Sequence, residues 1–313
     1  MTYVIRCVAL LFGALLAAAA GAQPAMEPRQ VAPGAWYVQG AAALGSRENQ
    51  NFVSNAGFVV TPAGVVVVDA LGSPAAARRL LEAIARITPL PVTHVIVTHY
   101  HADHIYGLQV LQQAGARILA HAGGRDYLQS ETAQLRLQAS RAEMAPWIDD
   151  STRLVAADQW LGEPTELEVG GVRFLLQPVG PSHTPEDLVV YLPDRKLLFA
   201  GDVVFRGRIP YVGQADSRHW ITALDALLQL DAEVIVPGHG PHSTEARADL
   251  QLTRDYLQYL RQAMGRAARN LDPFEAAYAA TDWSRFSHLP LFQQANRMNA
   301  YNTFLLLEHE PSD

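Results

Sequence analysis

Cysteine is almost absent from this 313-residue sequence, whose one cysteine, Cys7, lies in a segment that we expect to be removed. Without cysteine, the remaining chain has neither a disulfide nor a thiolate that could act as a nucleophile or bind a metal ion. Basic residues are also few: 24 Lys and Arg stand against 31 Asp and Glu, which gives a net charge of −7. This sign argues against a nucleic-acid partner, because binding phosphates requires a basic surface.

The first 22 residues have the pattern of a secretory signal peptide. Arg6 is the positive charge, residues 7–20 are apolar or small, and Ala20-Gly21-Ala22 fits a small-x-small cleavage site. The apolar run is roughly 14 residues, shorter than the ~20 residues that a membrane-spanning helix needs, and no later run approaches that length. We therefore predict a periplasmic protein, residues 23–313, without a stable membrane span; an uncleaved anchor is the alternative.

Strand-like and helix-like segments alternate along the rest of the chain. Strands are predicted at Ala35–Gln39, Asn51–Val60, Val65–Asp69, Val92–Thr98, Arg117–His121, Val172–Val179, Leu188–Leu192, Lys196–Phe199 and Glu233–Val236. Helices are predicted at Pro74–Ile87, Asp103–Ala114 and Ser217–Leu230, in an insertion over residues 123–165 and in a tail over residues 243–313. With no internal repeat and no low-complexity linker, residues 23–313 are expected to form one domain. Two groups of strands interleaved with helices predict an α+β fold with sheets inside and helices outside.

The residues that carry chemistry are concentrated after the predicted strand Val92–Thr98. Three histidines and one aspartate follow within six positions, namely His99, His101, Asp103 and His104. Neutral imidazole and carboxylate groups are ordinary zinc ligands, and a loop that leaves a strand can direct several of them at one point. In an extended segment His99 and His101 point to the same side, which suits two ligands of one metal ion. Asp103 and His104 follow where the chain turns into a helix, so they can reach a second ion.

Three further residues of ligand type stand at the ends of predicted strands. His183 follows one strand after a Gly-Pro-Ser turn, Asp202 follows the next as Gly-Asp, and His239 follows the last within Gly-His-Gly. Each of them alone would be explained as a loop residue or a capping group. Together with the first cluster they make seven ligand-type residues at strand ends, which indicates a metal site.

The order His-x-His-x-Asp-His, then His, Asp and Gly-His-Gly, resembles the metallo-β-lactamase superfamily of binuclear metallohydrolases over roughly Ala35 to His242. This resemblance implies a four-layer αβ/βα sandwich with the metal ions at one edge of the sheets. It also implies one metal ion held by His99, His101 and His183, and a second held by Asp103, His104 and His239, with Asp202 bridging the two. Asp69 resembles the acid that orients the first ligand loop in this family through hydrogen bonds.

The residue at the bridging position differs between branches of this superfamily. One large subgroup of β-lactamases has cysteine there and another has serine, whereas this chain has Asp202, as thioesterases, lactonases, phosphodiesterases and sulfatases do. The resemblance therefore implies two Zn²⁺ ions and a hydrolase in which a hydroxide shared by them attacks a small ester, thioester, lactone or related substrate. Asp103, beside the metal ions, is the expected acid–base residue.

The sequence leaves three other functions open. Mononuclear-iron persulfide dioxygenases share the His-x-His-x-Asp-His pattern, so an iron-dependent oxidoreductase is one alternative. The second is an amide hydrolase of the β-lactamase type, and the third is a non-catalytic metal-binding accessory protein of a quinoprotein system. Metal content separates the first of these from a zinc hydrolase.

A second resemblance concerns the setting and the substrate of the protein. The stretches 98–107, 179–187 and 199–213 are similar to exported metallohydrolases found beside sulfur-oxidation and quinoprotein dehydrogenase systems, which implies such a system as a partner. A small-molecule substrate fits this acidic chain better than a nucleic acid. Arg206 and Arg208 are candidates to bind a carboxylate, sulfate or phosphate of that substrate. Tyr211 and His219 are expected at the same rim of the site.

Overall fold

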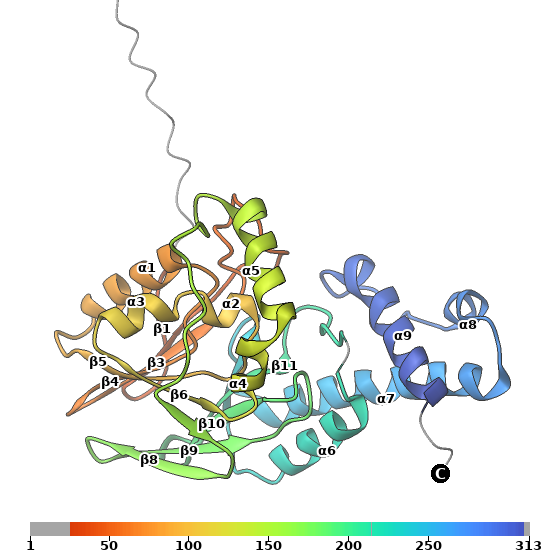
Figure 1. Ribbon diagram of the computed structural model, residues 1–313. Helices are drawn as coiled ribbons and strands as arrows, with labels where there is room; N and C mark the ends of the chain where they lie inside the picture. Colours follow the sequence, from red (N-terminus) through yellow and green to blue (C-terminus); the bar gives the residue numbers. More distant parts are fainter. Residues whose placement is uncertain (1–25, 214, 310–313) are drawn as a thin grey trace, which may run out of the picture.

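Two β-sheets pack face to face, with helices on both outer faces (Figure 1). The computed structural model describes residues 26–213 and 215–309, so the predicted signal peptide, residues 1–22, lies outside the described residues. The predicted α+β sandwich is confirmed, with layers in the order helix, sheet, sheet, helix. Within the described part of the chain, no helix is both long and apolar enough to cross a membrane.

The first sheet has seven strands, which neighbour one another in the order of the chain. They are β1 (Arg29–Ala32), β2 (Ala35–Val38), β3 (Ala56–Thr61), β4 (Gly64–Val68), β5 (Val92–Ile96), β6 (Arg117–His121) and β7 (Gln159–Leu161). Strands β1 to β4 pair in antiparallel fashion, whereas β4 to β7 are parallel. The valine run of β4 is buried throughout, as expected of a strand with both faces covered.

The second sheet has five strands in the order β12-β11-β10-β9-β8. Their bounds are β8 (Thr165–Val169), β9 (Val172–Pro178), β10 (Leu188–Leu192), β11 (Leu197–Phe205) and β12 (Val234–His239), with a 3₁₀ turn at Pro193–Arg195. Strands β11 and β12 are parallel, and the other neighbours are antiparallel. The carboxyl ends of β11 and β12 therefore lie at one edge, next to the chain that leaves β4 and β5.

Apolar side chains fill the space between the sheets and the spaces under the helices. Phe174 and Phe199 pack with residues of the first sheet between the two sheets. A Cβ at Gly57 would overlap the Phe199 ring, so glycine at this position lets the two sheets approach. Helices α1 (Pro74–Ala85) and α3 (Leu108–Gln113) cover the first sheet, and α6 (Ser217–Leu227) and α7 (Ala246–Asn270) cover the second.

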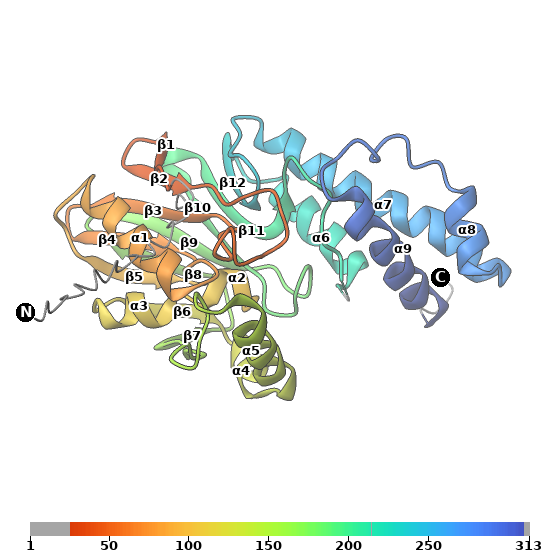
Figure 2. The ribbon, with the colours of Figure 1, turned by 90° about the horizontal axis from the view of Figure 1, so that it is seen from above.

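The C-terminal region is helical, as predicted, and extends beyond the sheets (Figures 1 and 2). Helix α7 continues past the second sheet, and α8 (Phe274–Ala280) and α9 (Phe292–His309) pack against it. The long amphipathic pattern of α7 explains this arrangement, because its apolar face is longer than the sheet that it covers. Pro210 and Val212, which precede α6, are hydrogen-bonded to Asn299 on α9.

Two predicted helical segments are wrong in part. The segment Asp103–Ala114 forms two short helices, α2 (Ala102–Ile105) and α3, separated by a turn at residues 106–107, where the N–H of Gly107 donates to the carbonyl oxygen of Leu71 instead of to a helical partner. The segment 123–165 is helical only in α4 (Gly124–Gln129) and α5 (Glu131–Met144). Pro146 disfavours helical backbone at the residue before it, so α5 ends there and the chain returns to the sheets as β7 and β8.

Two predicted strands also differ from those observed. The strand expected at Asn51–Val60 begins only at Ala56, because Asn51 has a positive φ of 56° and the segment before Ala56 is a loop. The strand expected at Lys196–Phe199 continues to Phe205, so Asp202 lies within it rather than after it. Gly201, with φ of 51°, shifts the pairing of β11 with β12 and so allows the strand to continue past a bulge.

Replacing the buried Asn55 by alanine is expected to lower the free energy of unfolding by about 2–4 kcal/mol. The Asn55 amide donates to the carbonyl oxygens of Pro237 (2.7 Å) and Gly240 (2.8 Å), and its oxygen accepts from the Gly40 N–H (3.1 Å). The substitution would leave these buried backbone groups unpaired. Urea unfolding in excess EDTA measures the change without a contribution from bound metal. Substituting the exposed Asn270 by alanine should change stability by less than about 0.5 kcal/mol, and an equal loss in both variants would contradict the assignment.

Candidate metal centre

Seven histidine and aspartate side chains meet at the edge where β5, β11 and β12 end. The loop after β5 carries His99 and His101, and α2 carries Asp103 and His104. The other three come from the second sheet: His183 precedes β10, Asp202 lies in β11, and His239 ends β12. Their ligand atoms form two groups, each within 4.8 Å: one has His99, His101, His183 and Asp202, and the other has Asp103, His104 and His239. The structure thus places the predicted ligand-type residues together, in the two groups that the resemblance implied.

Asp202 lies between the two groups. Its carboxylate oxygens are 3.4 Å from Nε2 of His183 and 3.9 Å from Nε2 of His99 in the first group. They are 3.3 Å from Nε2 of both His104 and His239 in the second group. One carboxylate therefore faces ligand atoms of both groups, which is the position that a bridging ligand requires.

Three histidines are oriented by hydrogen bonds at their Nδ1 atoms. Nδ1 of His104 donates to Asp69 (2.9 Å), and Nδ1 of His239 donates to the carbonyl oxygen of Val53 (2.9 Å). The Thr98 hydroxyl donates to Asp69 (2.8 Å), so its oxygen can accept from Nδ1 of His99 (3.1 Å). In the neutral form of each ring the proton is therefore held at Nδ1, which leaves the Nε2 lone pair facing the site.

The donor set at this site fits metal ions. Nε2 of His99, Nε2 of His104 and one carboxylate oxygen of Asp202 are buried without a hydrogen-bond partner. Buried polar atoms are nearly always paired, so three unpaired atoms that face the same site are typical of a ligand-binding site. Imidazole and carboxylate groups together are typical ligands of zinc and of iron. These residues could therefore hold metal ions.

The charges of these groups are coupled. Burial and the neighbouring His183 lower the pKa of His101 to about 3. Burial opposes a charge on His239 as well, but the carboxylates of Asp202 and Asp103 outweigh it and raise its pKa to about 9. In turn, His239 and His104 hold the pKa of Asp202 well below its usual range despite burial. Without a metal ion, the site therefore keeps its carboxylates ionised and retains protons on part of its imidazoles.

Metal binding to the metal-free protein is expected to release protons at neutral pH. His239, with its pKa raised to about 9, is protonated at pH ~7, and an imidazole binds a metal ion only after losing that proton. The apparent zinc affinity should therefore decrease as the pH is lowered below about 9, because His239, and likewise His104 with its raised pKa, become protonated. Calorimetric zinc titrations in buffers of different ionisation enthalpy count the protons released. Binding without proton release near neutral pH would contradict this prediction.

Asp69 anchors the loop that carries the first histidines. It follows β4 with a positive φ of 64°, and its side chain accepts from the backbone N–H (2.8 Å) and the hydroxyl of Thr98 and from His104. One carboxylate thus fixes both the start of the loop and a ring at its end. This contact is the one that the resemblance implied for Asp69.

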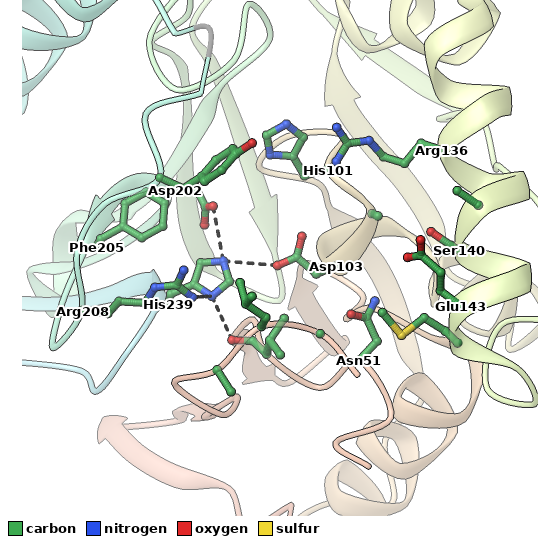
Figure 3. A pocket seen from close by; sticks show the side chains of 18 residues that line it. Asn51, His101, Asp103, Arg136, Ser140, Glu143, Asp202, Phe205, Arg208 and His239 are labelled. Atoms are coloured by element: carbon green, nitrogen blue, oxygen red, sulfur yellow. Dashed lines mark hydrogen bonds and ion pairs between the residues drawn. The ribbon is translucent and has the colours of Figure 1, made fainter. Parts of the chain in front are cut away.

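A cavity of about 360 Å³ opens above the site (Figure 3). Asp103, Asp202 and His239 form its floor, and helix α5 contributes Arg136 and Glu143 to its wall. Helix α5 belongs to the segment that was predicted as an insertion. Sequence reasoning missed Arg136 as a residue of the site, because it is one of four arginines in residues 123–165 and no motif distinguishes it from the others.

Of the four predicted substrate-binding residues, two line this cavity and two do not. Arg208 and Tyr211 line the cavity, and the Tyr211 ring centre is 6.3 Å from that of His183. Arg206 does not line it, because its guanidinium pairs with Asp249 (2.9 Å) on α7. His219 does not lie at the rim of the site, so the prediction for this residue is wrong.

His219 is held away from the cavity by the start of α6. Its ring is 61% exposed and bonded to Asp216 (2.7 Å). Asp216 is the N-cap of α6 and also accepts from the backbone N–H of His219, so this residue stays on the outer face of the helix. Neither cavity that touches the site has His219 among its lining residues.

Comparison with known proteins agrees with this fold and site. Residues 50–239 match the family model of the metallo-beta-lactamase superfamily. This match covers more than half of the chain, so the protein belongs to the metallo-β-lactamase superfamily.

Among individual relatives, the chain is 31% identical over 179 residues to the 2,4-dinitroanisole O-demethylase subunit alpha of Nocardioides sp. (strain JS1661), which covers 56% of this chain and 49% of that one. It is 24% identical over 238 residues to a linear primary-alkylsulfatase of Pseudomonas sp. (strain ATCC 19151), and this match covers 65% of this chain and 45% of the alkylsulfatase. It is 29% identical over 202 residues to a metallo-beta-lactamase type 2 of Bacillus cereus, and this match covers 63% of this chain and 71% of the lactamase. The chain thus spans about half the length of the first two relatives.

Solved structures show the same fold. The sec-alkylsulfatase Pisa1 from Pseudomonas sp. superposes with a TM-score of 0.71 at 18% identity, covering 90% of this chain and 50% of that one. The metallo-beta-lactamase family protein TTHA1429 from Thermus thermophilus superposes with a TM-score of 0.63 at 21% identity, covering 88% and 93%. At these identities the similarity establishes the architecture.

Proposed function

We propose that this protein is an exported hydrolase with two Zn²⁺ ions, acting on a small substrate that carries an ester, thioester, lactone or related bond. The observation that carries the proposal is the position of Asp202, whose carboxylate lies 3.3–3.9 Å from imidazole nitrogens of both ligand groups. The superfamily match supports a metal-dependent hydrolase. The relatives named as hydrolases of sulfate esters and β-lactams support bond hydrolysis as the reaction class.

Two groups of ligand-type residues, with Asp202 between them, are available to hold two ions. His99, His101 and His183 would hold one ion, Asp103, His104 and His239 would hold the other, and Asp202 would contact both. Bound there, two divalent ions would lower the pKa of a shared water and polarise the bond to be broken. The described residues from 26 onward include no cysteine, so nitrogen and oxygen atoms are the available ligands.

Asp103 is suited to proton transfer at the floor of the cavity. Its side chain is 22% exposed, compared with 5% for Asp202, so a substrate in the cavity can reach it. Its carboxylate lies near His104 and 3.2 Å from Nε2 of His239, and although desolvation raises its pKa, these two imidazoles outweigh that effect and lower it. Asp103 would therefore accept a proton from water and pass it to the leaving group.

Arg208 is suited to bind a negatively charged group of the substrate. It is 7% exposed, and its Nε has no hydrogen-bond partner. Its guanidinium packs over the Phe205 ring (5.8 Å) and borders the cavity next to His239, opposite Arg136 in Figure 3. A buried guanidinium without a bonded carboxylate is a good receptor for a substrate carboxylate, sulfate or phosphate.

Replacing Arg208 by alanine is expected to raise KM by roughly 10- to 100-fold for a negatively charged substrate, with a small change in kcat. Metal content should not change, because Arg208 is not among the ligand-type residues. Steady-state kinetics with anionic and neutral substrates of the same reacting bond measures the effect. The matched control is Arg206→Ala, which removes an arginine paired with Asp249 outside the cavity. An equal KM effect in both variants would show that Arg208 has no direct role.

The proposal is tested first by the metal content of the mature protein, expressed with its export signal and purified without chelators. About two zinc ions per chain are expected, together with turnover in a screen of thioesters, lactones, sulfate esters and β-lactams. About one iron per chain with little zinc would overturn the proposal in favour of oxygen-dependent chemistry on persulfides. Two zinc ions without turnover of any substrate would favour the accessory metal-binding role.

A further inference from the structure

A second cavity touches the candidate metal centre at His101 and His183. Its volume is about 520 Å³, and it shares His101, Arg136 and Tyr211 with the first cavity. The first cavity touches the Asp103 and His239 side of the site, whereas the second does not. Helix α9 forms the outer wall of the second cavity, mainly through Met298. Two cavities therefore adjoin the site among the described residues, and the C-terminal region lines one of them.

Buried hydrogen bonds hold this wall in place. The fully buried Asn299 on α9 donates to the carbonyl oxygen of Pro210 (2.7 Å) and accepts from the N–H of Val212 (2.9 Å). Both neighbours of Tyr211 are thus bonded to one side chain. Separating α9 from this loop would leave buried backbone groups unpaired, which is costly. The wall is therefore a fixed part of the site.

Two polar side chains of this cavity are engaged in hydrogen bonds within the protein. The amide nitrogen of Asn302 donates to the carbonyl oxygen of Gly213 (2.8 Å), and the hydroxyl of Thr184 donates to Asp187 (3.0 Å). The exposed apolar side chains that line this cavity are Pro185, Tyr211 and Met298, whereas Val212 is buried. Arg136 lies where the two cavities meet.

We propose that the second cavity binds an uncharged, predominantly apolar group of the substrate. The charged group lies in the first cavity at Arg208, and the reacting bond lies between them at the metal centre. The substrate is then elongated, anionic at one end and aliphatic at the other. This proposal rests on the proposed function for the position of the reacting bond, and on the second cavity alone for the apolar group.

Equilibrium binding of straight-chain carboxylates to the zinc-loaded protein tests the proposal without requiring turnover. Calorimetry with acetate, butanoate, hexanoate and octanoate should show an affinity gain of about twofold or more per added methylene, which corresponds to partial burial of each group. Met298→Trp, which fills the cavity, should reduce the ratio of octanoate to acetate affinity at least tenfold. The matched control is Leu305→Trp, because Leu305 and Met298 are 37% and 36% exposed on the same helix but only Met298 lines the cavity.

Met298→Gln gives an independent variant of similar size, and it should weaken octanoate binding more than acetate binding. Equal affinities for acetate and octanoate in the unmodified protein would overturn the proposal, and so would equal effects of the two tryptophan substitutions. Chain-length-dependent binding without hydrolysis of any ester would overturn the hydrolase assignment alone. Hydrolysis of short and long esters with equal kcat/KM, and without chain-length-dependent binding, would overturn the apolar subsite alone.

Discussion

Replacing Asp202 by alanine is expected to lower turnover by at least about a thousandfold and to reduce the zinc content from two ions per chain to one or fewer. The reason is its position, since its carboxylate faces His99 and His183 on one side and His104 and His239 on the other. Without it, neither group has a full set of ligands, and the four imidazoles lose the negative charge that offsets two metal ions. Elemental analysis and steady-state kinetics on the same preparation measure both effects.

The control for this substitution is Asp194→Ala, which removes an exposed carboxylate that pairs with Arg173 on the far strand β9. It should leave metal content and turnover unchanged. An Asp202→Ala protein with both zinc ions and normal turnover would show that this carboxylate does not bridge the ions. Loss of turnover with full metal content would assign to Asp202 a role in the reaction other than metal binding.

Replacing Asp69 by alanine should weaken zinc affinity by roughly 10- to 100-fold and also destabilise the fold. The substitution leaves three donors unpaired near the site: the N–H and hydroxyl of Thr98 and Nδ1 of His104. Each unpaired buried donor costs about 1–3 kcal/mol, so a total loss of several kcal/mol is expected. Competition with a chromophoric chelator measures the affinity, and urea unfolding in EDTA measures the metal-independent part.

Asp69→Asn separates the two effects of this residue. The asparagine oxygen can still accept from the Thr98 hydroxyl and from His104, which share one carboxylate oxygen of Asp69, but the amide NH₂ group then faces the Thr98 N–H and cannot accept from it. The substitution also removes the negative charge that raises the basicity of His104 as a metal ligand. We expect an intermediate loss of stability and a zinc affinity close to that of the alanine variant. Unchanged zinc affinity in both variants would show that Asp69 stabilises the loop without orienting its ligands.

The fold was predictable because its signals are local. Valine-rich strands such as Gly64–Val68 and the capped helix that begins at Pro74 are set by short-range patterns, and the structure contains both. The missed details depend on partners distant in the chain. The extension of β11 to Phe205 is an example, because it depends on the shifted pairing of Gly201 with β12. No periodicity within residues 196–205 contains that information.

In the candidate site too, some residues were predictable from local sequence and others depend on contacts with distant parts of the chain. The seven ligand-type residues were recognisable because polar side chains at the ends of apolar strands stand out in sequence, and the fold brings those ends together. Arg206 and Arg208 are two residues apart in one loop and indistinguishable by pattern. Asp249 on α7 binds Arg206 and so takes it away from the cavity, which leaves Arg208 as the arginine of this loop that lines it.

By itself, therefore, the sequence determined the layered fold and where along the chain the metal-binding residue types occur, because strand periodicity and residue chemistry are properties of short segments. The tertiary structure alone decided the shape of the substrate space. Arg136 from α5, Met298 from α9 and the loop held by Asn299 come from segments that are far apart in the chain. Packing of the helices on the sheets fixes their distances, and no short-range pattern encodes that packing.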